Sequence, residues 1–218
     1  MKIFIESCWQ SMIGKNRSGF GAYEMLTVCV MLLIIVAFAL ANVFKTDYKE
    51  KYDVMEYNAR MFSLSANNVY LVNGTKSLYT LQMLIDKKIY SNIKNPFQGA
   101  KYCDSNLSKV EFKNGKRYVT LECGNYLIYN QNTLDDSYTI YRVSKWSDEK
   151  GNKDNQKVVF YNYRVNGKDV FNNGLEKDTF LYEYNKINGT EFKTIKEIPG
   201  SSNVSKKTMY RNIEKVSD

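Results

Sequence analysis

The chain contains 218 residues, of which 44% are hydrophobic and 25% are charged, and 31 basic against 23 acidic side chains give a formal net charge of +8. This balance is typical of a globular protein and excludes disorder over the whole chain. The sequence has no histidine, so the usual base of serine and cysteine triads and a common zinc ligand are absent. We therefore expect a protein that is not an enzyme and that holds no cofactor and no metal ion.

A run of 20 residues without a charge extends from Met25 to Phe44. A helix rises ~1.5 Å per residue, so this run covers about 30 Å, the thickness of the hydrocarbon core of a bilayer. The run is longer than the apolar part of an ordinary secretory signal, and it lacks the polar face that a core helix of a soluble protein presents. It predicts a helix that crosses the cytoplasmic membrane once.

Charged residues before this run predict its orientation. Lys2, Lys15 and Arg17 precede the run, and most of the chain follows it. By the positive-inside rule, the amino terminus lies in the cytoplasm and the head of the protein lies on the extracytoplasmic side. Glu24 stands at the cytoplasmic edge of the run, where a carboxylate buried among lipid tails costs a few kcal/mol. We expect this carboxylate to have a partner.

The segment KNRSGFGAYEML, which leads into the apolar run, resembles the prepilin signal of type IV pilins and of the pseudopilins of type II secretion and competence systems. In that family a short basic leader ends in glycine, the mature chain begins with phenylalanine or methionine, and its fifth residue is glutamate. Gly19, Phe20 and Glu24 stand at these positions, whereas residues 21–23 differ from the commonest pattern. Cleavage after Gly21 is a second possible register, but it would make Glu24 the third residue instead of the fifth.

The resemblance implies that a prepilin peptidase cuts after Gly19 and that the new terminal amine, on Phe20, is N-methylated. The 199 residues that remain carry a net charge of +6. The subunit would remain in membrane lipid before assembly. The pilus assembly machinery would then pack it with copies of itself and with other pilins into a cell-surface filament. In the dry bundle of helices, Glu24 would need a neighbour's Phe20 ammonium, and this pair would set the register.

The resemblance leaves two function classes open. The chain is either a structural subunit of such a filament, as a major or a minor pilin, or a single-pass membrane protein with an extracytoplasmic sensor or binding domain. In the second case Glu24 only reaches the lipid interface. DNA is a further conceivable partner of a basic, aromatic head, but a net charge of +6 without a dense basic patch gives it weak support.

After the apolar run, large or apolar residues recur every three or four positions, as on one face of a helix: Phe44, Tyr48, Tyr52, Met55, Ala59, Phe62, Ala66 and Val69. The pattern ends near Asn73-Gly74, a pair typical of helix ends. We expect a leader over residues 1–19, a membrane or filament-core helix over 20–44, its amphipathic continuation over 45–73 and a globular head over 74–218. A coiled-coil seam would give the same stripe, but the repeat is short, which favours a helix docked on the head.

The sequence of the head predicts an α+β fold in which the long N-terminal helix packs on an antiparallel β-sheet, as in pilins. Asn114-Gly115 lies between two strand-like runs and predicts a tight hairpin. The remaining expected elements are a helix over Ser77–Lys88, strands over Val110–Phe112, Tyr118–Leu121, Tyr126–Tyr129, Tyr138–Lys145 and Lys157–Val165, and, less distinctly, a helix over Asp178–Ile187.

Cys103 and Cys123 flank the predicted hairpin in the extracytoplasmic head, where oxidation is permitted. We predict that they form a disulfide, which for a loop of this length stabilises the head by roughly 3 kcal/mol. The alternative is a pair of thiols. Acidic residues in loops, such as Asp135 and Asp136, lack the spacing of a calcium-binding loop and predict only solvated charges.

Overall fold

The computed structural model describes residues 21–73, 76–151 and 154–216. The chain divides after Glu50 into two compact units, residues 1–50 and 51–218, and each is described by itself. The first unit holds the expected leader, and Gly19 and Phe20 lie outside the described residues. The second unit combines the end of the long helix with the head.

Helix α2 (Ala22–Asn73) is 52 residues long and is built as the apolar run and the stripe after it predict. Over Tyr23–Leu40 its mean hydropathy is 2.4 and none of the window is buried. Within the described residues it is the one helix that is long and apolar enough to cross a membrane. The prediction of a helix suited to a single membrane span is therefore confirmed at the level of length and composition.

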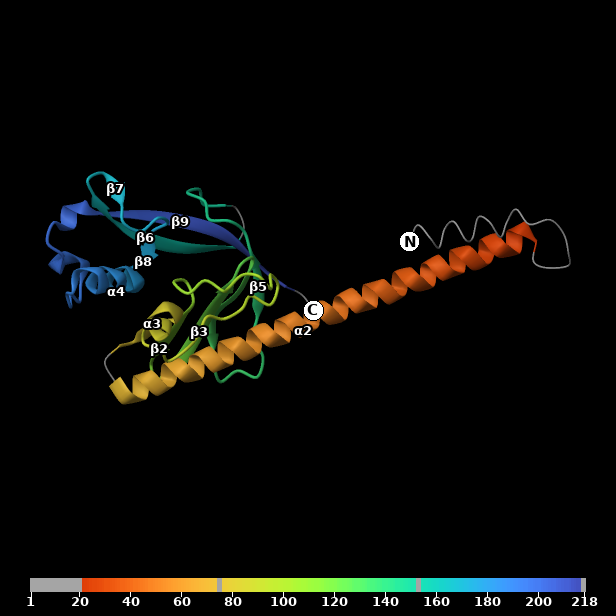
Figure 1. Ribbon diagram of the computed structural model, residues 1–218, viewed down its shortest axis with the longest axis horizontal. Helices are drawn as coiled ribbons and strands as arrows, with labels where there is room; N and C mark the ends of the chain where they lie inside the picture. Colours follow the sequence, from red (N-terminus) through yellow and green to blue (C-terminus); the bar gives the residue numbers. More distant parts are fainter. Residues whose placement is uncertain (1–20, 74–75, 152–153, 217–218) are drawn as a thin grey trace. The chain divides into compact units, whose positions relative to one another are not determined.

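The described part of the second unit contains an antiparallel, curled β-sheet (Figure 1). Its strands follow the order β1-β2-β3-β4-β5-β9-β6-β7, and β8 pairs with β6 beside this path. The long strand β9 pairs with β5 near its carboxyl end and with β6 along the rest of its length. The bounds are β1 (Leu78–Thr80), β2 (Lys109–Lys113), β3 (Lys116–Cys123), β4 (Tyr126–Asn132), β5 (Ile140–Val143), β6 (Asn155–Val165), β7 (Lys168–Asp169), β8 (Leu175–Glu176) and β9 (Val204–Lys215).

The end of α2 that belongs to the second unit runs along one face of the strands β1 to β5 (Figure 1). The apolar side chains at its helical period are fully or almost fully buried and share one core with Leu121 and Ile128 of the sheet. The helix is thus docked on the head over this part, as expected, and the stripe is used for that contact. The buried members of the stripe are Met55, Ala59, Phe62, Ala66 and Val69.

The predicted hairpin is confirmed. Strands β2 and β3 pair from Lys109 and Thr120 to Lys113 and Lys116. Asn114 and Gly115 have φ values of 52° and 72°, which is the left-handed backbone that a two-residue turn of this kind requires. Asparagine and glycine adopt this conformation at the lowest cost, so these two residues fix the register of the hairpin.

The helix expected over Ser77–Lys88 is wrong in its first part. Leu78–Thr80 forms β1, which pairs with β2, and helix α3 covers only Leu81–Asp86. The Thr80 hydroxyl accepts a hydrogen bond from the Met83 N–H at 3.2 Å and so caps the helix at this point. The open edge of β2 offers hydrogen bonds that outweigh a helical start for three residues.

Helix α4 (Lys177–Asn188) confirms the less distinct helix expectation for this region. Its buried face forms a second core with Leu175 of β8 and Ile198, and Figure 1 shows it beside β6 and β8. Gly189, at φ 64°, ends the helix. Strand β9 follows the short helices η1 (Ile195–Glu197) and η2 (Ser201–Asn203) and was not expected from the sequence.

Candidate functional site

Glu24 lies in the first turn of α2 and has a local partner. Its Oε2 accepts a hydrogen bond from the backbone N–H of Gly21, the residue before the helix, at 2.8 Å. A glutamate at the third helical position commonly reaches back in this way to cap a helix. The positive end of the helix dipole also stabilises its negative charge. The spacing from Gly21 to Glu24 is the sequence signal of this cap.

The apolar surface of the first unit surrounds the helix. Between Tyr23 and Leu40 the large apolar side chains are exposed, among them Leu33 and Phe38 at 69% each. This apolar surface is far larger than the exposed apolar patches that soluble monomers usually have. It requires a cover of lipid or of other apolar helices.

A second exposed apolar surface lies on the part of α2 that belongs to the head unit. We call it the outer stripe. Its members follow helical spacing on the side of α2 opposite the residues that are buried against the sheet. Tyr57 is 62% exposed and Leu71 is 72% exposed. The outer stripe consists of Val54, Tyr57, Met61, Leu64 and Leu71. The sequence does carry a signal for it, since Val54, Tyr57, Met61 and Leu64 recur at spacings of three and four beside the stripe that begins at Phe44.

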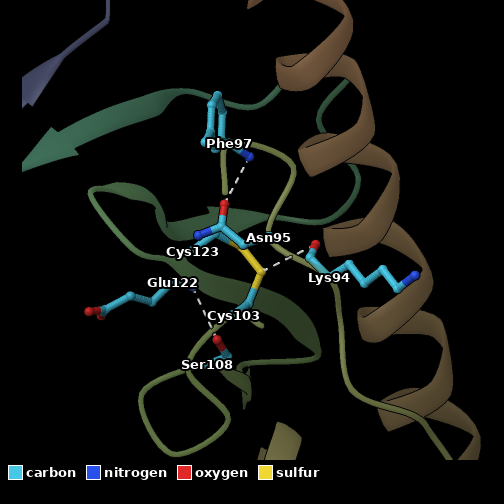
Figure 2. Close-up of a disulfide and its surroundings, with 7 residues drawn as sticks. All are labelled: Lys94, Asn95, Phe97, Cys103, Ser108, Glu122 and Cys123. Carbon is cyan, nitrogen blue, oxygen red and sulfur yellow. Dashed lines mark hydrogen bonds between the residues drawn. A yellow bond between two sulfur atoms is a disulfide. The ribbon is translucent and has the colours of Figure 1, made fainter. Parts of the chain in front are cut away.

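Cys103 and Cys123 form the predicted disulfide. Figure 2 shows it joining the segment before Ser108 to strand β3. Both cysteines are buried in the core that the end of α2 shares with the sheet. The Ser108 hydroxyl accepts a hydrogen bond from the Glu122 N–H at 3.1 Å, next to the bridge. The disulfide thus fixes the loop on which the helix packs.

A buried ion pair joins β3 and β9, two internal strands that β4 and β5 separate in the order of the sheet. Both Nη atoms of Arg211 in β9 lie 2.7 Å from the two carboxylate oxygens of Glu122 in β3, and Arg211 Nε donates to Gln156 Oε1 at 2.8 Å. The guanidinium also lies 4.2 Å above the ring of Trp146. Burial raises the pKa of Glu122, and the hydrogen bonds from Arg211 oppose this shift. Two-point pairing of this kind fixes orientation as well as distance.

A second polar contact joins α3 to α4. Asp86 Oδ2 accepts from Lys186 Nζ at 2.8 Å and from the Tyr182 hydroxyl at 3.1 Å, while Oδ1 accepts from Gln82 at 3.0 Å. Burial alone would raise the pKa of Asp86, but these three hydrogen bonds and the charge of Lys186 lower it. Burial and the neighbouring carboxylate raise the pKa of Tyr182 to about 12. The contact therefore holds a charged Asp86 and a neutral Tyr182.

No group of side chains suited to hold a metal ion occurs in the part of the chain that the structure describes. The structure brings the predicted cysteines together, places Glu24 at the start of α2, and leaves Gly19 and Phe20 outside the described residues. Comparison of the chain with protein-family models, with curated proteins and with solved structures finds no match.

Proposed function

We propose that this chain is a structural subunit of a type IV pilus-like filament, cut by a prepilin peptidase after Gly19 and assembled through α2. The observation that carries the proposal is the exposed apolar surface of α2 on both sides of Glu50. A folded head with an apolar helix of this kind needs a partner for the helix. Membrane lipid supplies one before assembly, and neighbouring subunits supply one in the filament.

The outer stripe favours a filament over a permanent membrane anchor. A bilayer covers about 20 residues of a helix, and Tyr23–Leu40 already has the length and hydropathy for that. The outer stripe begins at Val54 and lies outside any such span. A single-pass sensor would leave these side chains in water, whereas side-by-side packing of α2 helices would cover both surfaces with protein.

Glu24 supports the same proposal. In a bundle of apolar helices its carboxylate retains the Gly21 N–H as one partner. One neutral donor leaves most of the charge uncompensated, and a buried charge of this kind needs an opposite charge. The terminal amine that cleavage creates on Phe20 of the neighbouring subunit would be that charge. The pair would form only at one stagger of the two helices, so it would select the register.

Mass spectrometry of the protein from cells that contain a prepilin peptidase tests the proposal. We expect a mature chain that begins with N-methylated Phe20, in a fraction that mechanical shearing releases from the cell surface. A terminus at Ala22 would move the cut to the second register, in which Glu24 is the third residue. A chain that keeps Met1 and stays in the membrane would contradict the proposal and would favour the single-pass sensor or binding protein.

A further inference from the structure

A groove of about 1040 Å³ opens in the head, away from α2. One wall comes from β6 and β9 with the loop after β7, and the other comes from residues 104–107 with parts of α3 and α4. Its volume is at the upper end of the range of ligand sites in proteins. Glu122, the acidic partner of the buried pair, and Trp146, whose ring lies under Arg211, both line it.

The loop over residues 171–174 is held in one shape. The Asn162 side chain accepts a hydrogen bond from the Phe171 N–H at 2.9 Å and donates one to the Phe171 carbonyl. Gly174 has φ 72°, and a Cβ at this position would stand 2.9 Å from the Cβ of Phe160. Only glycine fits here without displacing β6. The groove is thus preformed, which lowers the entropy cost of binding.

The charges in the groove cancel. Four acidic and four basic side chains line it, and most of them already have a partner of opposite sign. Arg164 pairs with Asp169 at 2.9 Å, and Lys207 pairs with Asp148 at 2.7 Å. Among the lining cations, Lys206 alone has no partner in the described residues, so an ionic ligand with more than one charge would have to displace one of these contacts. The groove therefore suits a neutral polar ligand better than a phosphate, a nucleic acid or an acidic peptide.

Apart from Lys206, the groups left for a ligand are mainly amides and aromatic rings. The side-chain amides of Asn106, Asn172 and Asn173 make no hydrogen bond with other described residues. An amide presents a donor beside an acceptor, which matches neighbouring hydroxyl groups that each donate and accept. Trp146 and Phe171 add apolar ring surface, which the C–H faces of a sugar ring can cover.

We propose that this groove binds a neutral oligosaccharide. A peptide strand is the alternative occupant. β6 offers it no open edge, because β6 is paired with β9 on one side and with β8 and β7 on the other where it lines the groove. β9 pairs with β5 only from Ile213 to Lys215, so residues 204–209 have no strand partner on that side, and the peptide is therefore tested beside the oligosaccharide. The inference stands on the groove alone and holds whether or not the chain assembles into a filament.

Trp146 provides the readout. The sequence has two tryptophans, Trp9 and Trp146, so Trp9→Phe in the full chain leaves one reporter in the groove wall. The chain is purified in a detergent without a sugar headgroup. It is then titrated with neutral oligosaccharides of glucose, mannose, galactose and N-acetylglucosamine and, separately, with an uncharged hexapeptide of alanine and serine. We expect a saturable change in Trp146 fluorescence with at least one oligosaccharide and none with the peptide.

Variants of exposed asparagines locate the site. Asn172→Ala with Asn173→Ala should weaken the binding of that oligosaccharide by about tenfold, which corresponds to ~1.4 kcal/mol. Asn125→Ala, an exposed asparagine outside the groove, is the matched control and should change binding less than about twofold. Circular dichroism verifies that all variants fold. Saturable binding of the peptide alone, no response to any oligosaccharide, or equal affinities of the two variants would overturn the proposal.

Discussion

The carboxylate of Glu24 caps its own helix by accepting the N–H of Gly21 at 2.8 Å. The same carboxylate is the group that the proposed filament would pair with a neighbour's terminal amine. These two roles need different properties, since a cap needs only an acceptor and the pair needs a negative charge. The two roles can be separated by substitutions that remove one property at a time.

We predict that Glu24→Gln keeps the cap but prevents assembly, because glutamine can accept from the Gly21 N–H without a charge. Glu24→Leu should prevent assembly as well, while membrane insertion remains intact because the span becomes more apolar. The measurement is the amount of each variant that shearing releases from cells that also express the wild type. Normal release of Glu24→Gln would show that the charge is not needed, and equal release of Glu24→Leu would remove the proposed mechanism altogether.

The outer stripe gives a second prediction. Leu64→Glu places a charge on the stripe, on the side of α2 away from the sheet. In detergent, it should change the free energy of unfolding of the chain by less than about 0.5 kcal/mol. In cells, it should abolish the release of filaments by shearing. Asn67→Glu, on the flank of the same helix, introduces the same charge off the stripe and is the control. If both variants assemble equally well, the outer stripe is not a contact between subunits.

The disulfide should contribute measurably to the stability of the head. Replacing Cys103 and Cys123 together by serine should lower the free energy of unfolding by roughly 3 kcal/mol, as estimated from the length of the closed loop. Thermal unfolding of the oxidised wild type, the reduced wild type and the double variant measures this loss. Cys29→Ala, which lies outside the bridge, should unfold like the wild type. A reduced wild type that is as stable as the oxidised protein would contradict the prediction.

Arg211 and Glu122 should behave as a coupled pair. Removing only the guanidinium, by Arg211→Met, leaves a buried carboxylate without its partner and should cost about 3 to 5 kcal/mol. The double variant Arg211→Met with Glu122→Leu should be less destabilised, because no charge is left in the interior. Urea unfolding of the two single variants and the double variant completes the cycle. Strictly additive losses would show that the pair is not coupled.

The hydrogen bonds of Asp86 predict that the free energy of unfolding depends on pH. Its pKa is lower in the folded state than in the unfolded chain, so its ionised form stabilises the fold. This contribution is complete above the ordinary aspartate pKa of about 4 and is lost as the pH falls through the lower folded value. Asp86→Asn should therefore unfold more easily than the wild type at pH 6. The difference should shrink below about pH 4, and a constant difference down to pH 2 would contradict this assignment.

The sequence predicted those elements whose signals are local. The period of α2, the Asn114-Gly115 turn and the apolar face of α4 each lie within one short segment, and the structure has all three. The start of β1 was misjudged because Leu78–Thr80 is a strand only through its pairing with β2. Strand β9 was missed for a similar reason. Its Lys206 and Lys207 interrupt any apolar alternation, and its position depends on β5 and β6.

The same difference between local and long-range signals applies to the candidate site. The approach of Cys103 to Cys123 could be expected from their placement around one hairpin. The groove could not be expected, because its walls come from eight separate segments between Gln82 and Met209. The contact of Arg211 with Glu122 also crosses 89 positions of sequence. Contacts of this range depend on the curl of the sheet, which no local pattern encodes.

The pairing of β5 with β9 has a consequence for how the head is made. Residues 144–203 separate the two strands, and β6 and α4 lie within this interval. During synthesis β5 therefore has an unpaired edge for as long as it takes residues 144–203 to be added. An unpaired strand edge readily accepts a strand from another chain. A newly made head is thus most vulnerable to misassociation in this interval, and a factor that shields β5 would raise the yield of folded protein.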